Sequence, residues 1–121
     1  MSNLAIEVDS RRGLVLVTPA TSITVDDARI AFKEIVGMPE FHKGMPSLWD
    51  LRYTELMHIN AKDNKTLSEF ANEIKEQRGV ARIAIVVGSD LGFGLARMFE
   101  LLNEATHLQA RVFRTMDVGQ R

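Results

Sequence analysis

Apolar residues recur along the chain with two different periods, one typical of strands and one typical of helices. The positions where the period changes divide the chain into predicted strands and helices. Alternation or a short unbroken apolar run indicates a strand, whereas apolar residues three or four positions apart indicate a helix. The pattern predicts strands at residues 4–8, 14–17, 46–52, 81–87 and 109–114. It predicts helices at residues 24–36, 62–78 and 91–105, with a candidate last helix starting at residues 115–117.

Turn and capping residues support these boundaries. The polar segment 9–13 lies between the first two strands and predicts the turn of an antiparallel hairpin. Pro19 ends the second strand, because proline offers no N–H group to a ladder. Thr24 is suited to cap the first helix, and Asp26 and Asp27 favour the positive end of its dipole.

The resulting order, β-β-α-β-α-β-α-β with an optional final helix, predicts an α/β protein with a mixed, mostly parallel sheet and packed helices. Strands that alternate with helices imply right-handed crossovers between parallel strands. The unbroken apolar run Ile83–Val87 is typical of a central strand. A length of 121 residues fits one domain, residues 1–121. The pattern leaves the order of the strands in the sheet open.

Composition narrows the classes of function. Fifteen basic and sixteen acidic residues are interspersed, and this argues against a nucleic-acid partner, which usually meets a basic stripe. The chain has no cysteine, so disulfides and thiolate metal sites are excluded. The first residues lack the pattern of a signal peptide, and no apolar run has the length of a membrane span. We therefore expect a cytoplasmic protein, with peripheral membrane contact left open.

Five segments carry a resemblance to a known family. They are residues 13–17 (GLVLV), 47–52 (SLWDLR), 82–87 (RIAIVV), 93–99 (FGLARMF) and 111–113 (RVF). With this element order, the chain resembles the SpoIIAA-like proteins, relatives of the STAS domains of sulfate transporters and anti-sigma-factor antagonists. The resemblance covers nearly the whole chain and implies a SpoIIAA-like sheet with helices packed on it. The same general fold is shared with lipid-carrier domains of the CRAL-TRIO type.

The resemblance does not carry over the phosphorylation switch of the antagonists. Their phosphorylated serine stands in an Asp-Ser-Ser-Gly turn after the third strand, whereas residues 58–61 here read His-Ile-Asn-Ala. A phospho-regulated, antagonist-like role would need a hydroxyl group elsewhere, and Thr54, Thr66 and Ser68 lie nearby.

Two segments supply candidate binding residues. Residues 88–94 follow the central strand and open a helix, where open α/β sheets often bind ligands and free N–H groups can hold an anion. Their spacing matches neither a dinucleotide fingerprint nor a P-loop, so helix capping and tight turning are the alternative. Asp50 and Arg52 point to one face of a strand, either to recognise a ligand head group or to form a salt bridge that organises the loop. The candidate ligand-binding or partner-binding residues are Asp50, Arg52, Ser89, Asp90, Leu91, Gly92, Phe93, Gly94 and Arg97.

The helix predicted at residues 91–105 has one apolar side and one isolated apolar residue. Leu91, Leu95 and Phe99 gather on the apolar side, whereas Phe93 falls opposite, near Arg97. Phe93 is therefore a candidate anchor for a membrane, a lipid or a protein. The alternative is that its ring folds back onto the sheet.

The sequence predicts no catalytic residue, metal site or cofactor. The three histidines, His42, His58 and His107, lack ligand spacing, and no nucleophile motif is present. We therefore expect a non-enzymatic binding or regulatory module, whose partner is a protein or a small apolar or amphipathic ligand. A lipid-binding or membrane-associating protein is the first alternative, and the sequence leaves open whether the chain forms a homodimer.

Overall fold

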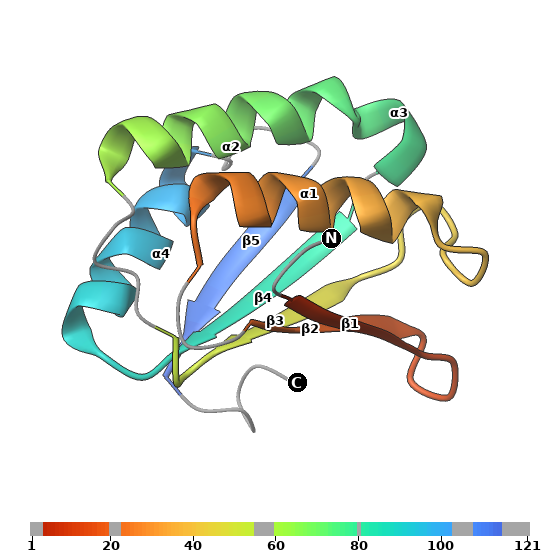
Figure 1. Ribbon diagram of the computed structural model, residues 1–121, viewed down its shortest axis with the longest axis horizontal. Coiled ribbons are helices and arrows are strands. Elements are labelled where there is room, and N and C mark those ends of the chain that lie inside the picture. Colours follow the sequence, from red (N-terminus) through yellow and green to blue (C-terminus); the bar gives the residue numbers. More distant parts are fainter. Residues whose placement is uncertain (1–3, 20–22, 55–59, 80, 103–107, 115–121) are drawn as a thin grey trace.

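The computed structural model describes residues 4–19, 23–54, 60–79, 81–102 and 108–114, and within them strands and helices follow the predicted order (Figure 1). The strands are β1 (Leu4–Asp9), β2 (Leu14–Pro19), β3 (Ser47–Leu51), β4 (Ala81–Val87) and β5 (Leu108–Phe113). The helices are α1 (Val25–Gly37), α2 (Ala61–Glu73), α3 (Lys75–Arg78) and α4 (Asp90–Leu102).

The five strands form one sheet in the order β1-β2-β3-β4-β5. The β1–β2 pair is antiparallel, and the other three pairs are parallel. The parallel register places Val17, Trp49, Ile85 and Val112 in one row across the sheet. This confirms the predicted mixed, mostly parallel sheet with an antiparallel hairpin at its edge.

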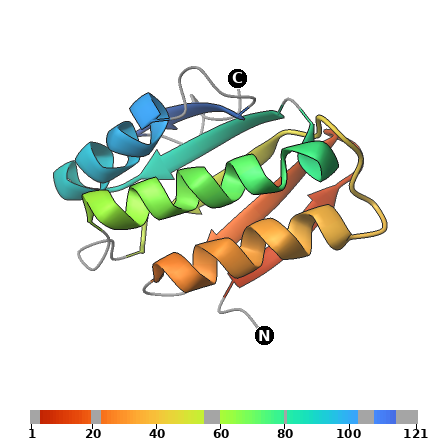
Figure 2. The same cartoon turned by 90° about the horizontal axis from the view of Figure 1, so that it is seen from above.

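The helices α1, α2 and α4 lie on one face of this sheet (Figures 1 and 2). From β2 onward, each crossover connection leads to the adjacent strand, and the chain always moves across the sheet in the same direction. Because such connections are right-handed, every crossover helix lies on the same face of the sheet. No helix in the described part of the chain covers the opposite face. The structure therefore has two layers, helices above and sheet below.

Capping boxes begin the first two helices. The Thr24 hydroxyl accepts a hydrogen bond from the Asp27 backbone N–H at 3.1 Å, and the Asp27 carboxylate accepts one from the Thr24 N–H at 3.0 Å. Asn60 and Asp63 form the same reciprocal pair at the start of α2. These contacts satisfy backbone donors that a helix start leaves unpaired. They confirm the predicted role of Thr24 and show that Asn60 serves as a cap.

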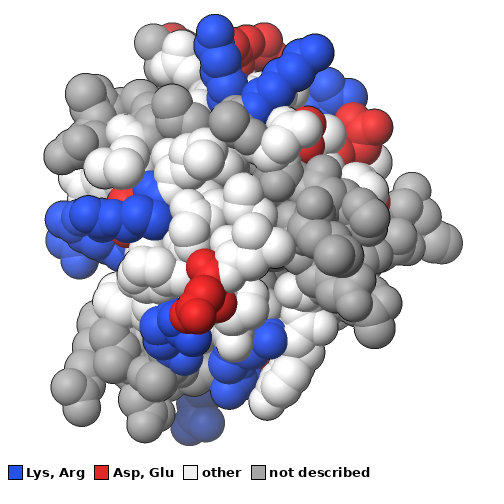
Figure 3. Space-filling model, turned by 90° about the vertical axis from the view of Figure 1, so that its left-hand side faces the viewer, with Lys and Arg blue, Asp and Glu red and all other residues white. Residues whose placement is uncertain are grey.

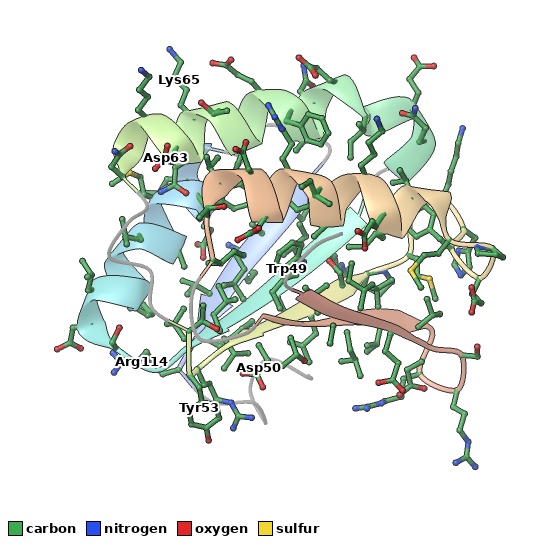
Figure 4. The ribbon with its side chains drawn as sticks, viewed as in Figure 1. Trp49, Asp50, Tyr53, Asp63, Lys65 and Arg114 are labelled. Carbon is green, nitrogen blue, oxygen red and sulfur yellow. The ribbon has the colours of Figure 1, made fainter. Side chains whose placement is uncertain are left out.

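The core fills the space between the helices and the sheet. Phe32 of α1 meets Trp49 of β3 edge to face, with ring centroids 5.3 Å apart, and stacks on Phe70 of α2 at 6.4 Å. Aromatic pairs favour both geometries. The buried Trp49 indole donates to the Ser47 hydroxyl at 3.2 Å, so its polar atom is satisfied. Figure 4 shows Trp49 between the sheet and α1.

The helix expected over residues 62–78 is interrupted, because α2 ends at Glu73 and the short α3 follows. Ile74 leaves helical geometry, with φ −99° and ψ 14°, and this residue breaks the run. The expected continuation of the next helix to residue 105 and the candidate helix at residues 115–117 lie outside the described residues. In the described part of the chain, no helix has the length and apolar character needed to cross a membrane.

Candidate ligand-binding site

The candidate residues lie at one end of the molecule, where the carboxyl ends of the parallel strands meet the N-termini of the helices. This is the left-hand end in Figure 1. In open α/β sheets, ligands bind in the crevice beyond these strand ends. The structure thus brings the two candidate segments, after β3 and after β4, to the same edge of the sheet.

Asp50 and Arg52 pair with each other directly. The Arg52 guanidinium donates from Nε to Asp50 Oδ1 at 2.9 Å and from Nη2 to Oδ2 at 3.0 Å. These side-chain hydrogen bonds hold the pKa of the Asp50 carboxyl below its usual value. The guanidinium carbon also lies 5.3 Å from the ring centre of Tyr53, an exposed residue that Figure 4 labels near Asp50. This geometry favours the salt bridge that organises the loop, because both charged groups are already engaged.

The segment that joins β4 to α4 is held by a cap and by a close backbone contact. The Ser89 hydroxyl accepts a hydrogen bond from the Gly92 N–H at 3.0 Å, so Ser89 caps α4. A Cβ on Gly88 would stand 2.3 Å from the carbonyl oxygen of Arg52, closer than real Cβ contacts allow. Gly92 itself is buried. The glycine at position 88 therefore lets this segment approach the end of β3.

Arg114 connects the start of α4 to the end of β5. Its Nη1 lies 3.0 Å from Asp90 Oδ1, and its guanidinium carbon lies 5.8 Å from the ring centre of Phe93. Phe93 is half-buried and packs against the core. Leu91 is instead the exposed apolar residue at this helix start. Gly94 is exposed in α4, with open space where a Cβ would stand.

The ion-pair partner of Arg97 is a residue that the sequence pattern does not identify as a candidate. Arg97 forms an ion pair with Glu100, which is only 7% exposed. The second Glu100 oxygen, Oε2, accepts the backbone N–H of Val112 in β5 at 3.0 Å, and Arg111 lies 3.6 Å from Oε1. Glu100 follows Arg97 by three residues and so falls on the same side of the helix, and nothing in the helical pattern indicates a strand edge beside it.

A cavity of about 70 Å³, partly open to solvent, lies between the sheet and the helices. Its walls come from β3, β4, the three long helices and the residue before α1's cap. They are built by Ile23, Ala28, Phe32, Trp49, Leu51, Asn64, Leu67, Ile83, Ile85, Leu95, Ala96 and Phe99. The sequence gives no sign of this cavity, because its lining residues look like ordinary core residues of separate elements.

The described charged side chains do not form a patch of one sign around this end. Figure 3 shows it with described basic and acidic side chains scattered around uncharged ones. Among the described residues, no three His, Asp or Glu side chains come close enough to hold a metal ion. The cavity between the sheet and the helices is therefore better suited to a ligand than the charged groups at this end, and it suits an apolar ligand.

Comparisons with known proteins bear on the fold. No protein-family model and no curated protein matches the chain. A matching solved structure is that of an uncharacterised DUF3478-family protein from Shewanella loihica PV-4, which has a SpoIIAA-like fold. The TM-score is 0.55, and the alignment covers 96% of this chain and 88% of that one at 15% identity. The layered structure is thus a mixed α/β fold of a known class. More particularly, it is a SpoIIAA-like fold, and this confirms the fold that the sequence resemblance implied.

Proposed function

We propose that this protein is a non-enzymatic binding module that holds the apolar part of a small apolar or amphipathic ligand. The observation that carries the proposal is the partly open apolar cavity between the sheet and the helices. Small-molecule sites are typically concave and mostly apolar.

The size of the cavity sets what it can take. An engineered apolar cavity of roughly 150 Å³ stays free of water and binds benzene. At about 70 Å³, this cavity has room for only a few non-hydrogen atoms. A larger ligand would place one apolar end among Phe32, Trp49 and Phe99 and leave the rest at the opening.

The charged groups of the candidate segments support binding rather than catalysis. Asp50 is paired with Arg52, Asp90 with Arg114, and Arg97 with Glu100. A general acid or base has to be free to reach a substrate proton, whereas these side chains are engaged with each other.

The proposal can be tested through Trp49, which is the single tryptophan of the chain and lines the cavity. We expect 1-bromopentane to quench Trp49 emission in a saturable way, because bound bromine would lie against the indole. Ala96→Leu and Ala28→Val, which place extra carbon atoms in the cavity wall, should each remove the saturable part.

The matched control for Ala96→Leu is Ala5→Leu, which adds the same three carbon atoms to an exposed position on β1. It should quench like the unchanged protein, and thermal unfolding should confirm that every variant is folded. Quenching that rises linearly and equally in all four proteins would refute the proposal.

Membrane association has weaker support. With Phe93 packed on the core, it would rest mainly on Leu91, whose side chain is 56% exposed at the start of α4. Single exposed leucines are common on soluble domains. A phospho-regulated role draws no support from the start of α2, where Asn60 occupies the capping position.

A further inference from the structure

Among the described residues of the cavity wall, one has a polar amide side chain, Asn64 of α2, which is only 4% exposed. Its Nδ2 donates a hydrogen bond to the backbone carbonyl of Leu95 in α4 at 3.1 Å. Within the described part of the chain, no hydrogen bond to its Oδ1 is found. A buried acceptor without a partner costs free energy, and such atoms are few in folded proteins.

The position of Asn64 on its helix makes the amide unusual. Asn64, Leu67, Ala71 and Ile74 recur at helical spacing and are all buried, so they form the inward face of α2. An apolar residue at position 64 would complete this face without leaving a polar atom unsatisfied. The orientation of the amide is also determined, because the Leu95 carbonyl can only accept and must face the NH₂ group.

We infer that the ligand is a neutral apolar molecule with a hydrogen-bond donor, such as a hydroxyl group, which donates to Oδ1 of Asn64. This inference rests on the proposed function and adds the chemical class of the ligand. Among the described lining residues there is no lysine, arginine or histidine, so they offer a buried carboxylate no cation to offset its loss of hydration. A hydroxyl group, in contrast, satisfies the free acceptor and carries no charge.

Three probes of similar length separate these possibilities: 1-pentanol, 1-chloropentane, which has chlorine in place of the hydroxyl, and pentanoate. Titrations followed by NMR signals of the Asn64 side-chain NH₂ and the Trp49 indole N–H report binding at the cavity itself. We expect 1-pentanol to bind about fivefold more tightly than 1-chloropentane, the effect of one neutral hydrogen bond. Pentanoate should bind more weakly than both.

Asn64→Leu should abolish the preference for 1-pentanol while the Trp49 signal still responds to 1-chloropentane. The matched control is Asn72→Leu, an exposed position on the same helix, which should keep the preference.

Equal affinities for the two neutral probes would overturn the inference and leave the proposed function standing. A preference that survives Asn64→Leu would do the same. If no probe binds the unchanged protein, both the inference and the proposed function fail.

Discussion

At the scale of single residues, the structure at the carboxyl end of the sheet depends on its glycines as well as on its paired side chains. Gly88 passes so close to Arg52 that a Cβ would stand 2.3 Å from a backbone oxygen, which cannot rotate away. Six residues further on, Gly94 has open space where its Cβ would stand. The two glycines therefore have different physical roles, although the sequence shows them in one glycine-rich segment.

Substitution by alanine should separate these roles. We expect Gly88→Ala to lower the free energy of unfolding by about 2–3 kcal/mol, because the strands or the loop must move apart. Gly94→Ala should raise it by about 0.5–1 kcal/mol, since alanine is favoured inside a helix. Urea unfolding of both variants measures the difference. A neutral Gly88→Ala would show that this close approach is not a constraint of the fold.

At the scale of elements, Glu100 joins helix α4 to the edge of the sheet. Within the described residues, β5 is paired only with β4, so its other edge presents backbone groups outward. Glu100 accepts one of these, the Val112 N–H, and is itself held by Arg97. Unpaired edge strands invite pairing with other chains, and native proteins cover or charge them. The buried carboxylate covers the edge and orients α4, which forms one wall of the cavity.

Removal of the Glu100 carboxylate should destabilise both α4 and the edge strand β5. Glu100→Ala is expected to cost about 2–3 kcal/mol of stability and to speed amide hydrogen exchange at Val112, because a charge-assisted hydrogen bond is lost. Glu100→Gln, which keeps an acceptor oxygen, should lie between it and the unchanged protein. The control is Glu69→Ala, an exposed residue of α2. Unchanged exchange at Val112 in Glu100→Ala would contradict this role.

At the scale of the whole molecule, the sequence predicts the order of the elements well and their assembly only in part. Strand and helix periods are local properties, so the run Ile83–Val87 and the cap at Thr24 could be interpreted directly. The strand order depends on the direction of each crossover, for which the chain carries no local signal.

The candidate site shows the same limit. Asp50 and Arg52 are close in sequence, and their pairing was among the alternatives. The cavity joins residues from elements far apart in the chain, and Asn64 was missed because one amide on a helix looks like an ordinary polar residue. Distances between elements decide such features, and periodicity alone does not encode them.

The stability of the whole molecule should depend on pH through carboxyl groups at both ends of the strands. Hydrogen bonds from Arg52 lower the pKa of Asp50, and hydrogen bonds from Arg12 lower the pKa of Asp9 in the β1–β2 turn. A lowered pKa in the folded state means that the unfolded chain binds more protons at acidic pH. The stabilisation is therefore complete above the unfolded value, 3.8, and is lost as the pH falls from there through the folded value.

The variant Asp50→Asn isolates the contribution of the Asp50–Arg52 pair. At pH 7 the variant should be less stable than the unchanged protein by about 1 kcal/mol, because a charge-assisted hydrogen bond becomes a neutral one. As the pH falls below the unfolded pKa of 3.8, the difference should shrink, since the unchanged protein must also protonate Asp50. Urea unfolding followed by Trp49 fluorescence at several pH values measures both proteins. A difference that stays constant down to acidic pH would mean that the ion pair with Arg52 does not stabilise the end of β3, and that other contacts fix the loop that follows this strand.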